Sequence, residues 1–93
     1  MLSKKLKELR EGLKLPQRKV AAEIDIDTAT YSKIENGIYL PKREQVIILA
    51  RILDTQEEEL LKLWMADKIA QVTEGEEKIA PDALKIVQEN YLK

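Results

Sequence analysis

Residues 17–37 read QRKVAAEIDIDTATYSKIENG, and this stretch decides the fold. Its apolar residues fall at helical spacing in two short blocks, Val20, Ala21 and Ile24, then Tyr31 and Ile34. Between the blocks, the segment DID at 25–27, with the apolar Ile26 at its centre, ends the first helix, and Gly37 suits the left-handed cap that ends the second. Ala21 is small enough to lie where two crossing helices come closest. The stretch therefore predicts two short helices packed at a steep angle across a tight turn.

Leucines at helical spacing precede this pair of helices. They step by four, three and four residues, at Leu2, Leu6, Leu9 and Leu13. This one-sided stripe predicts an amphipathic first helix that ends near Gly12. Pro16 then fits the first turn of the next helix, where its missing N–H does no harm.

Three more helices are predicted after the pair. One covers about residues 42–53, and the next begins at Thr55, which forms a capping-box pattern with Glu58. The last begins at Pro81, beyond a connector at residues 73–77. No segment alternates with period two, which favours an all-α fold of five helices followed by a C-terminal helix.

The two halves of the 93-residue chain carry opposite net charge. Residues 1–51 contain eleven Lys and Arg against seven Asp and Glu, a net charge of +4. Residues 52–93 contain five Lys against ten Asp and Glu, a net charge of −5. The basic half could face a polyanion, and the alternative is that both halves are ordinary solvated helix surface.

The composition disfavours an enzyme, a cofactor and a metal site. The chain has no Cys, so it has no thiolate to bind a metal. It also has no His, the commonest metal ligand and general base. The acidic run QEEELL at 56–61 complements a helix dipole, as acids in a first turn do. No apolar run reaches the roughly 18 residues that span a membrane, and the N-terminus lacks a signal-peptide core. We therefore expect a soluble, cytoplasmic protein without membrane partners.

Residues 6–53 resemble the phage-repressor type of helix-turn-helix protein, often called the XRE or Cro-repressor family. The matching text is LKELREGLKLPQRKVAAEIDIDTATYSKIENGIYLPKREQVIILARIL. The resemblance implies a DNA-binding domain over residues 1–66 and a C-terminal helical extension over residues 67–93. In that family the third helix enters the major groove of double-stranded DNA and the second lies across the backbone. The protein would then be nucleoid-associated through DNA and would regulate transcription, most simply as a repressor.

The resemblance also implies which side chains meet DNA. The positions that face base edges are Thr28, Ala29, Thr30, Ser32 and Lys33. The positions that contact phosphates are Gln17, Arg18, Asn36, Tyr39, Lys42 and Arg43. Lys33 can donate to guanine O6 or N7, and Ala29 can touch a thymine methyl group. For each position the alternative is an ordinary exposed helix residue.

Other positions concern the fold instead of the DNA. The family pairs an Arg of the first helix with a Glu near the end of the third, which implies a structural ion pair between Arg10 and Glu35. Asp25 stands where the family often has Gly, and Asp tolerates the left-handed conformation better than most residues. Asp27 puts a negative charge beside the groove, so its carboxylate must point away from phosphate or accept from a cytosine amino group.

The acidic C-terminal part is predicted to form a homodimer. One helix-turn-helix unit reads too few base pairs to find a single site in a genome, and repressors of this type pair on palindromic operators. The apolar residues that exceed the needs of a five-helix core are Trp64, Met65, Ile69, Val72, Leu84, Ile86, Val87, Tyr91 and Leu92. The alternative is that the tail folds back over its own core. A second functional hypothesis is an antitoxin or anti-repressor that acts on a regulatory protein partner, which would leave the donors Lys33, Asn36 and Arg43 without a purpose.

Overall fold

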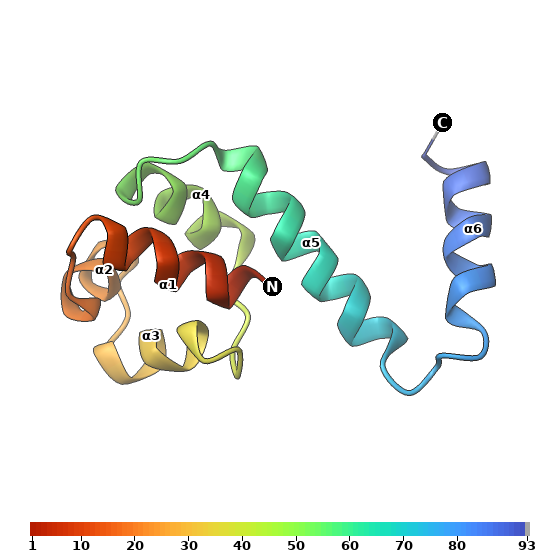
Figure 1. The fold of residues 1–93 in the computed structure, drawn as a ribbon, viewed down its shortest axis with the longest axis horizontal. Coiled ribbons are helices and arrows are strands. Elements are labelled where there is room, and N and C mark those ends of the chain that lie inside the picture. The colour runs from red at the N-terminus through yellow and green to blue at the C-terminus, as the bar shows by residue number, and fades with distance from the viewer. Residues whose placement is uncertain (93) are drawn as a thin grey trace.

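In residues 1–92, which the computed structural model describes, the chain forms six helices and no strand. They are α1 (Leu2–Gly12), α2 (Gln17–Glu23), α3 (Thr28–Glu35), α4 (Arg43–Ile52), α5 (Glu57–Thr73) and α6 (Ala80–Asn90). The all-α prediction is thereby confirmed. Figure 1 shows α1 to α4 and the first half of α5 gathered into one body, from which α5 leads away to α6. Among the described helices, none is long and apolar enough to cross a membrane.

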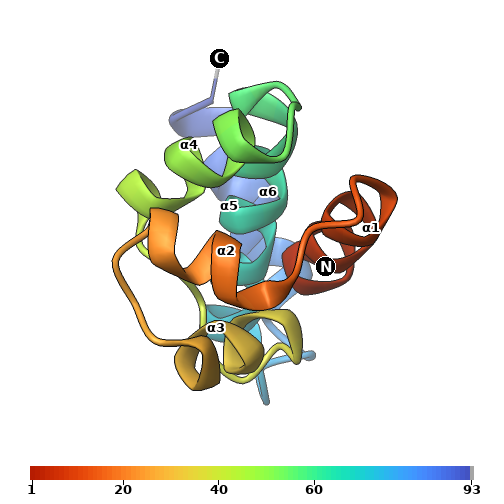
Figure 2. The same cartoon turned by 90° about the vertical axis from the view of Figure 1, so that its left-hand side faces the viewer.

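Residues from all five of the helices α1 to α5 and from their caps form a single hydrophobic core. It consists of Leu2, Leu6, Val20, Ala21, Ile24, Tyr31, Ile34, Val46, Leu49, Ala50, Leu53, Leu60 and Trp64. The helices α2 and α3 pack against each other at the side that Figure 2 turns to the viewer, and α2 also packs on α4. Every apolar residue of the two short blocks is buried, so the predicted helix pair is confirmed.

The turns of the helix pair follow the sequence prediction closely. Asp25 has φ 57°, so it does occupy the left-handed conformation between α2 and α3. Gly37 has φ 76° just after α3, the conformation that glycine adopts without a Cβ clash. Pro16 differs slightly, because its extended backbone makes it the N-cap that precedes α2 instead of a residue in the first turn.

The capping box predicted at Thr55 and Glu58 is wrong. The helix α5 begins one residue later, with Gln56 as its N-cap and no side-chain hydrogen bond to the cap. Thr55 serves the end of α4 instead, since its N–H donates to the carbonyl of Ala50 at 2.9 Å. A residue that closes one helix in this way is not in position to cap the next.

One expectation about the C-terminal part also changes. Trp64, expected at an intermolecular surface, is buried in the core, and its indole N–H donates to the Pro41 carbonyl at 2.8 Å. The helix α5 continues through residue 66 to Thr73, so the expected domain boundary falls inside it. Beyond it, α6 has no buried residue and does not fold back over the core (Figure 1).

Candidate nucleic-acid interface

The helix α3 is fixed at its start by Asp27. The Oδ1 atom of Asp27 accepts the N–H of Thr30 at 2.6 Å, which is the bond of an N-cap. Hydrogen bonding from that backbone N–H lowers the pKa of Asp27. The carboxylate, which the sequence leaves beside the groove, therefore orders the first turn that carries Thr28 and Ala29. An Asp three residues before Thr30 at a helix start is the signal that identifies this cap.

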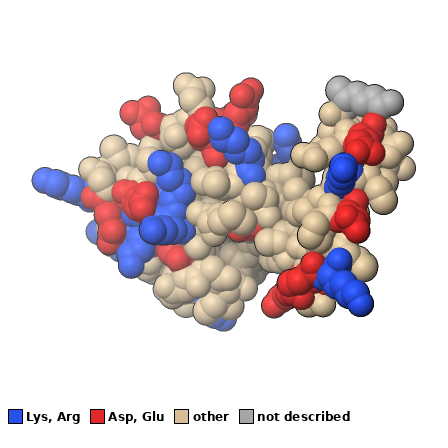
Figure 3. All heavy atoms as spheres, turned by 45° about the vertical axis from the view of Figure 1, so that its right-hand side comes forward, with Lys and Arg blue, Asp and Glu red and all other residues tan. Residues whose placement is uncertain are grey.

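One side of α3 anchors the helix, and the other faces outward. Tyr31, Ile34 and Glu35 are buried. Thr28, Ala29 and Lys33 are exposed, and Thr30 and Ser32 are half-buried. At 100° per residue these five side chains fall on one continuous arc opposite the buried side. The predicted base-facing residues thus share one surface, which we call the outer arc of α3. The lower edge of the body in Figure 3, where α3 lies, is largely uncharged.

Cationic and polar side chains are also exposed in α2, in the loop after α3 and at the start of α4. Arg18 in α2 and Lys42 and Arg43 at the start of α4 are exposed. Asn36 forms the C-cap of α3, and Tyr39 follows in the loop with 45% of its surface exposed. The helix α4 begins directly after Lys42, whose N–H donates to Gln45 Oε1 at 2.8 Å. The start of a helix carries the positive end of its dipole, which favours a bound anion such as a phosphate.

Gln17, which is predicted to contact a phosphate, also makes a contact inside the fold. Its side-chain Nε2 donates to Glu35 Oε1 at 3.1 Å, inside the fold. The amide group is therefore oriented by an internal carboxylate. The backbone N–H of Gln17, at the first position of α2, is among the donors that a helix N-terminus leaves without an intrahelical partner.

The buried ion pair joins three segments of the body. Arg10 Nε donates to Glu35 Oε2 at 2.7 Å, and Arg10 Nη2 donates to Glu35 Oε1 at 3.0 Å. Arg10 Nη1 also donates to the Leu15 carbonyl at 2.8 Å, so the same guanidinium holds the turn before α2. The side chains of Arg10 and Glu35 are 12% and 2% exposed. The end of α3 is therefore locked to α1.

The pKa values of this pair reflect their hydrogen bonds. Bonding to Glu35 raises the pKa of Arg10 above its usual value. For Glu35, burial alone would raise the pKa, but hydrogen bonds from Arg10 and Gln17 outweigh burial and hold it below its usual range. Burial raises the pKa of Tyr31, whose hydroxyl lies beside the pair without an acceptor in hydrogen-bond geometry.

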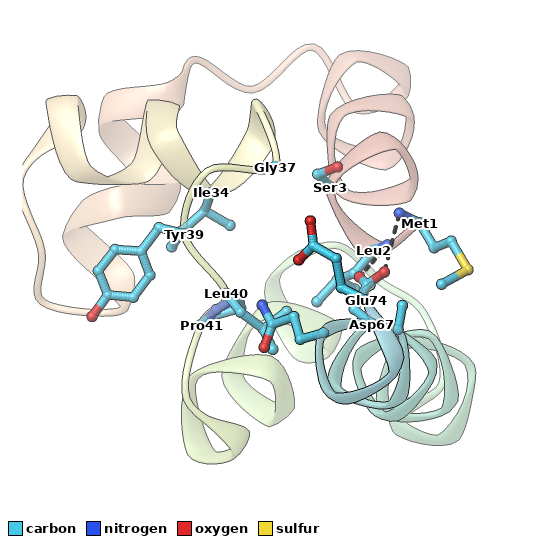
Figure 4. A pocket seen from close by; sticks show the side chains of 12 residues that line it. Met1, Leu2, Ser3, Ile34, Gly37, Tyr39, Leu40, Pro41, Asp67 and Glu74 are labelled. Atoms are coloured by element: carbon cyan, nitrogen blue, oxygen red, sulfur yellow. Dashed lines mark hydrogen bonds and ion pairs between the residues drawn. The ribbon is translucent and has the colours of Figure 1, made fainter. Parts of the chain in front are cut away.

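A second polar contact sets the direction of α5. Asp67 Oδ2 accepts the Leu2 N–H at 3.0 Å, and Asp67 Oδ1 lies 3.3 Å from the amino nitrogen of Met1 (Figure 4). These contacts line a hollow of about 270 Å³ between the start of α1, the loop after α3 and α5. They tie the second half of α5 to the body that carries α3. Within the described residues, no group of acidic side chains is arranged to hold a metal ion.

Comparisons with known proteins agree with this geometry. Residues 6–60, more than half of the chain, match the family described as Helix-turn-helix. The chain is also 30% identical over 101 residues to the cryptic phage CTXphi transcriptional repressor RstR of Vibrio cholerae serotype O1. That alignment covers 98% of this chain and 87% of the repressor. No solved structure gives a significant match.

Proposed function

Because this chain belongs to the XRE type of the helix-turn-helix family, we propose that it is a transcriptional repressor that binds a palindromic operator as a homodimer. The observation that carries the proposal is the outer arc of α3, whose five side chains are all uncharged or cationic. A helix displayed in this way fits the major groove of double-stranded DNA, which admits one α-helix. Likeness to a phage repressor over nearly the whole chain supports the regulatory role.

In this proposal the outer arc of α3 reads base edges. Lys33 donates to guanine, and the hydroxyls of Thr28 and Ser32 serve bases or the adjacent phosphates. Ala29 and the methyl group of Thr30 touch thymine methyl groups. The Asp27 cap and the buried ion pair hold the helix rigid, so that little conformational entropy is lost when it enters the groove.

Phosphate contacts would hold α3 in register. The exposed side chains of Arg18, Asn36, Tyr39, Lys42 and Arg43 would supply the donors, and Gln17 would supply its backbone N–H. Such contacts position a protein on the duplex without reading sequence. Residues 1–66 would thus contain the DNA contacts, and residues 67–93, together with the adjoining Met65, would make the pairing contacts.

Homodimer formation rests on apolar surface that the single chain leaves uncovered. Outside the core, the expected interface residues are all at least 40% exposed, namely Met65, Ile69, Val72, Leu84, Ile86, Val87, Tyr91 and Leu92. Large apolar side chains left exposed in this number are typical of a surface that makes a protein–protein contact. Two copies would present two α3 helices about 34–36 Å apart, one turn of the DNA, as helix-turn-helix dimers do.

The affinity for DNA is expected to fall steeply with salt. Arg18, Lys42 and Arg43 give three phosphate-neutralising cations per protomer and six per dimer, so the log–log slope against salt should be roughly −5. Fluorescence anisotropy on an operator selected from random duplexes measures the slope. A slope near zero would contradict binding through the duplex backbone.

Two alanine substitutions should separate base reading from phosphate binding. Lys33→Ala should weaken the preferred operator by about 1–3 kcal/mol and relax the choice of base at one position. Arg43→Ala should weaken all duplexes about equally and flatten the salt slope. Lys85→Ala in α6 is the matched control, since it removes the same charge far from α3 (Figure 1). Equal losses on operator and random DNA for Lys33→Ala would refute its assignment to a base.

A further inference from the structure

Two apolar stripes of the chain lie uncovered, one on each of the last two helices. The stripe of α5 begins at Leu61, which is half-buried against the core, and continues through the exposed Met65, Ile69 and Val72 on a helix face away from the buried Leu60 and Trp64. A shallow groove runs along part of it, lined by Glu58, Leu61, Lys62, Met65, Ala66 and Ile69. The stripe of α6 and its C-cap consists of Ala80, Ala83, Leu84, Val87 and Tyr91.

The two stripes match in length and in character. Each covers eleven residue steps, from Leu61 to Val72 and from Ala80 to Tyr91, and is therefore about 16 Å long. The positions beside the α6 stripe are the uncharged Gln88 and Asn90, so like charges do not meet along the seam.

The connector holds α6 away from its own α5. The N–H of Glu76 donates to the Thr73 carbonyl at 2.9 Å, and the N–H of Ala80 donates to the Glu76 carbonyl at 2.8 Å. Gly75 has φ 78°, a conformation that redirects the chain directly after α5. The turn is thus hydrogen-bonded in an open form, and α6 stands apart from the body (Figure 1).

We propose that the two copies of the chain exchange their last helices, so that the α6 stripe of each covers the α5 stripe of the other. This inference rests on the homodimer of the proposed function and says how it is built. Burying both stripes in two copies would remove on the order of 1,500 Å² from water, which is the size of a stable interface. The open connector explains why α6 reaches another chain instead of its own α5.

Charge disfavours a polyanion as the partner of the two stripes. Residues 52–93 carry a net charge of −5, so neither stripe is set to attract a polyanion such as DNA. Asp67 holds α5 to the body through the Leu2 N–H, so a copy seated on α5 has a defined orientation relative to α3. An exchanged pair would therefore also fix the spacing of the two recognition helices.

The absence of cysteine from the sequence allows a direct test. A tagged Met65→Cys chain is mixed and equilibrated with an untagged Leu84→Cys or Val87→Cys chain, and a short bismaleimide then joins nearby thiols. These two partners cover both directions in which α6 could run along α5. The exchange predicts a mixed-tag product in about tenfold excess over the Asp82→Cys control, which lies on the opposite face of α6. All four positions are exposed, so the substitutions leave the core intact.

Three other results would overturn the exchange. A Met65→Cys/Val87→Cys double variant that joins within one chain at every concentration would show that α6 closes on its own α5. Products between two Met65→Cys chains, without mixed products, would mean a dimer that pairs α5 with α5; this refutes the exchange and leaves the homodimer standing. A full-length chain that sediments as a monomer throughout would refute both.

Discussion

Replacing Glu35 by alanine is expected to lower the free energy of unfolding by about 3–5 kcal/mol. The reason is that Arg10, whose side chain is 12% exposed, would keep its charge inside the fold without a partner. The same change removes the acceptor for Gln17 and releases the end of α3 from α1. A domain of this size has a total stability of roughly 5–14 kcal/mol, so the variant should lose much of it. Urea unfolding followed by circular dichroism measures the difference.

An exposed ion pair of the same chain provides the control. Glu59 Oε1 lies 3.1 Å from Lys62 Nζ, and both side chains are more than half exposed. Glu59→Ala should therefore cost no more than about 0.5 kcal/mol. If Glu59→Ala and Glu35→Ala destabilised the protein equally, burial of the Arg10–Glu35 pair would not be the source of its stabilising effect.

The buried pair also predicts how stability depends on pH. The pKa of Glu35 is lower in the folded state than in the unfolded chain, so the carboxylate stabilises the fold above the usual range for glutamate. That contribution is lost as the pH falls through the unfolded and then the folded pKa, because the unfolded chain binds the proton first. The urea midpoint of the wild type should fall more steeply below about pH 5 than that of Glu35→Ala. Parallel curves for the two proteins would contradict the assignment.

Ending the chain after Thr73 is expected to weaken binding to a palindromic operator by about 10²–10⁴-fold. The truncated chain lacks α6, so two copies would no longer be joined and each would bind its half-site alone. Binding to a duplex with a single half-site should change little. Sedimentation velocity gives the oligomeric state, and anisotropy gives both affinities.

The site of truncation is chosen so that folding is not the variable. The helix α6 contributes no buried residue, and the cut falls where α5 ends. Thermal unfolding of the shortened chain should match that of the full-length protein at concentrations where both are monomeric. If the shortened chain stayed folded and kept full affinity for the palindrome, α6 would have no part in pairing.

Much of this molecule follows from short-range patterns in its sequence. The spacing of Leu2, Leu6, Val20, Tyr31 and Ile34 identifies the faces that form the core, because a helix repeats every 3.6 residues. The left-handed positions at Asp25 and Gly37 also follow from residue type, since few residues accept that conformation. The outer arc of α3 is visible in the sequence for the same reason: it is what remains once the buried face is assigned.

Other features depend on partners that are distant in the chain. Gln17 and Trp64 look available from their local sequence, yet they donate to Glu35 and to the Pro41 carbonyl, 18 and 23 residues away. Asp67 likewise receives the Leu2 N–H across 65 residues. Helical periodicity assigns a side chain to a face of its own helix and says nothing about which group meets that face.

By itself, the sequence determined the all-α class, the core faces and the family. The tertiary structure alone decided that α6 is held open with its apolar stripe uncovered. The physical reason is that the spacing of apolar residues along a helix indicates only which face of that helix must be covered. Which segment covers it depends on the direction in which the chain leaves each helix, and here the hydrogen-bonded turn around Gly75 sets that direction.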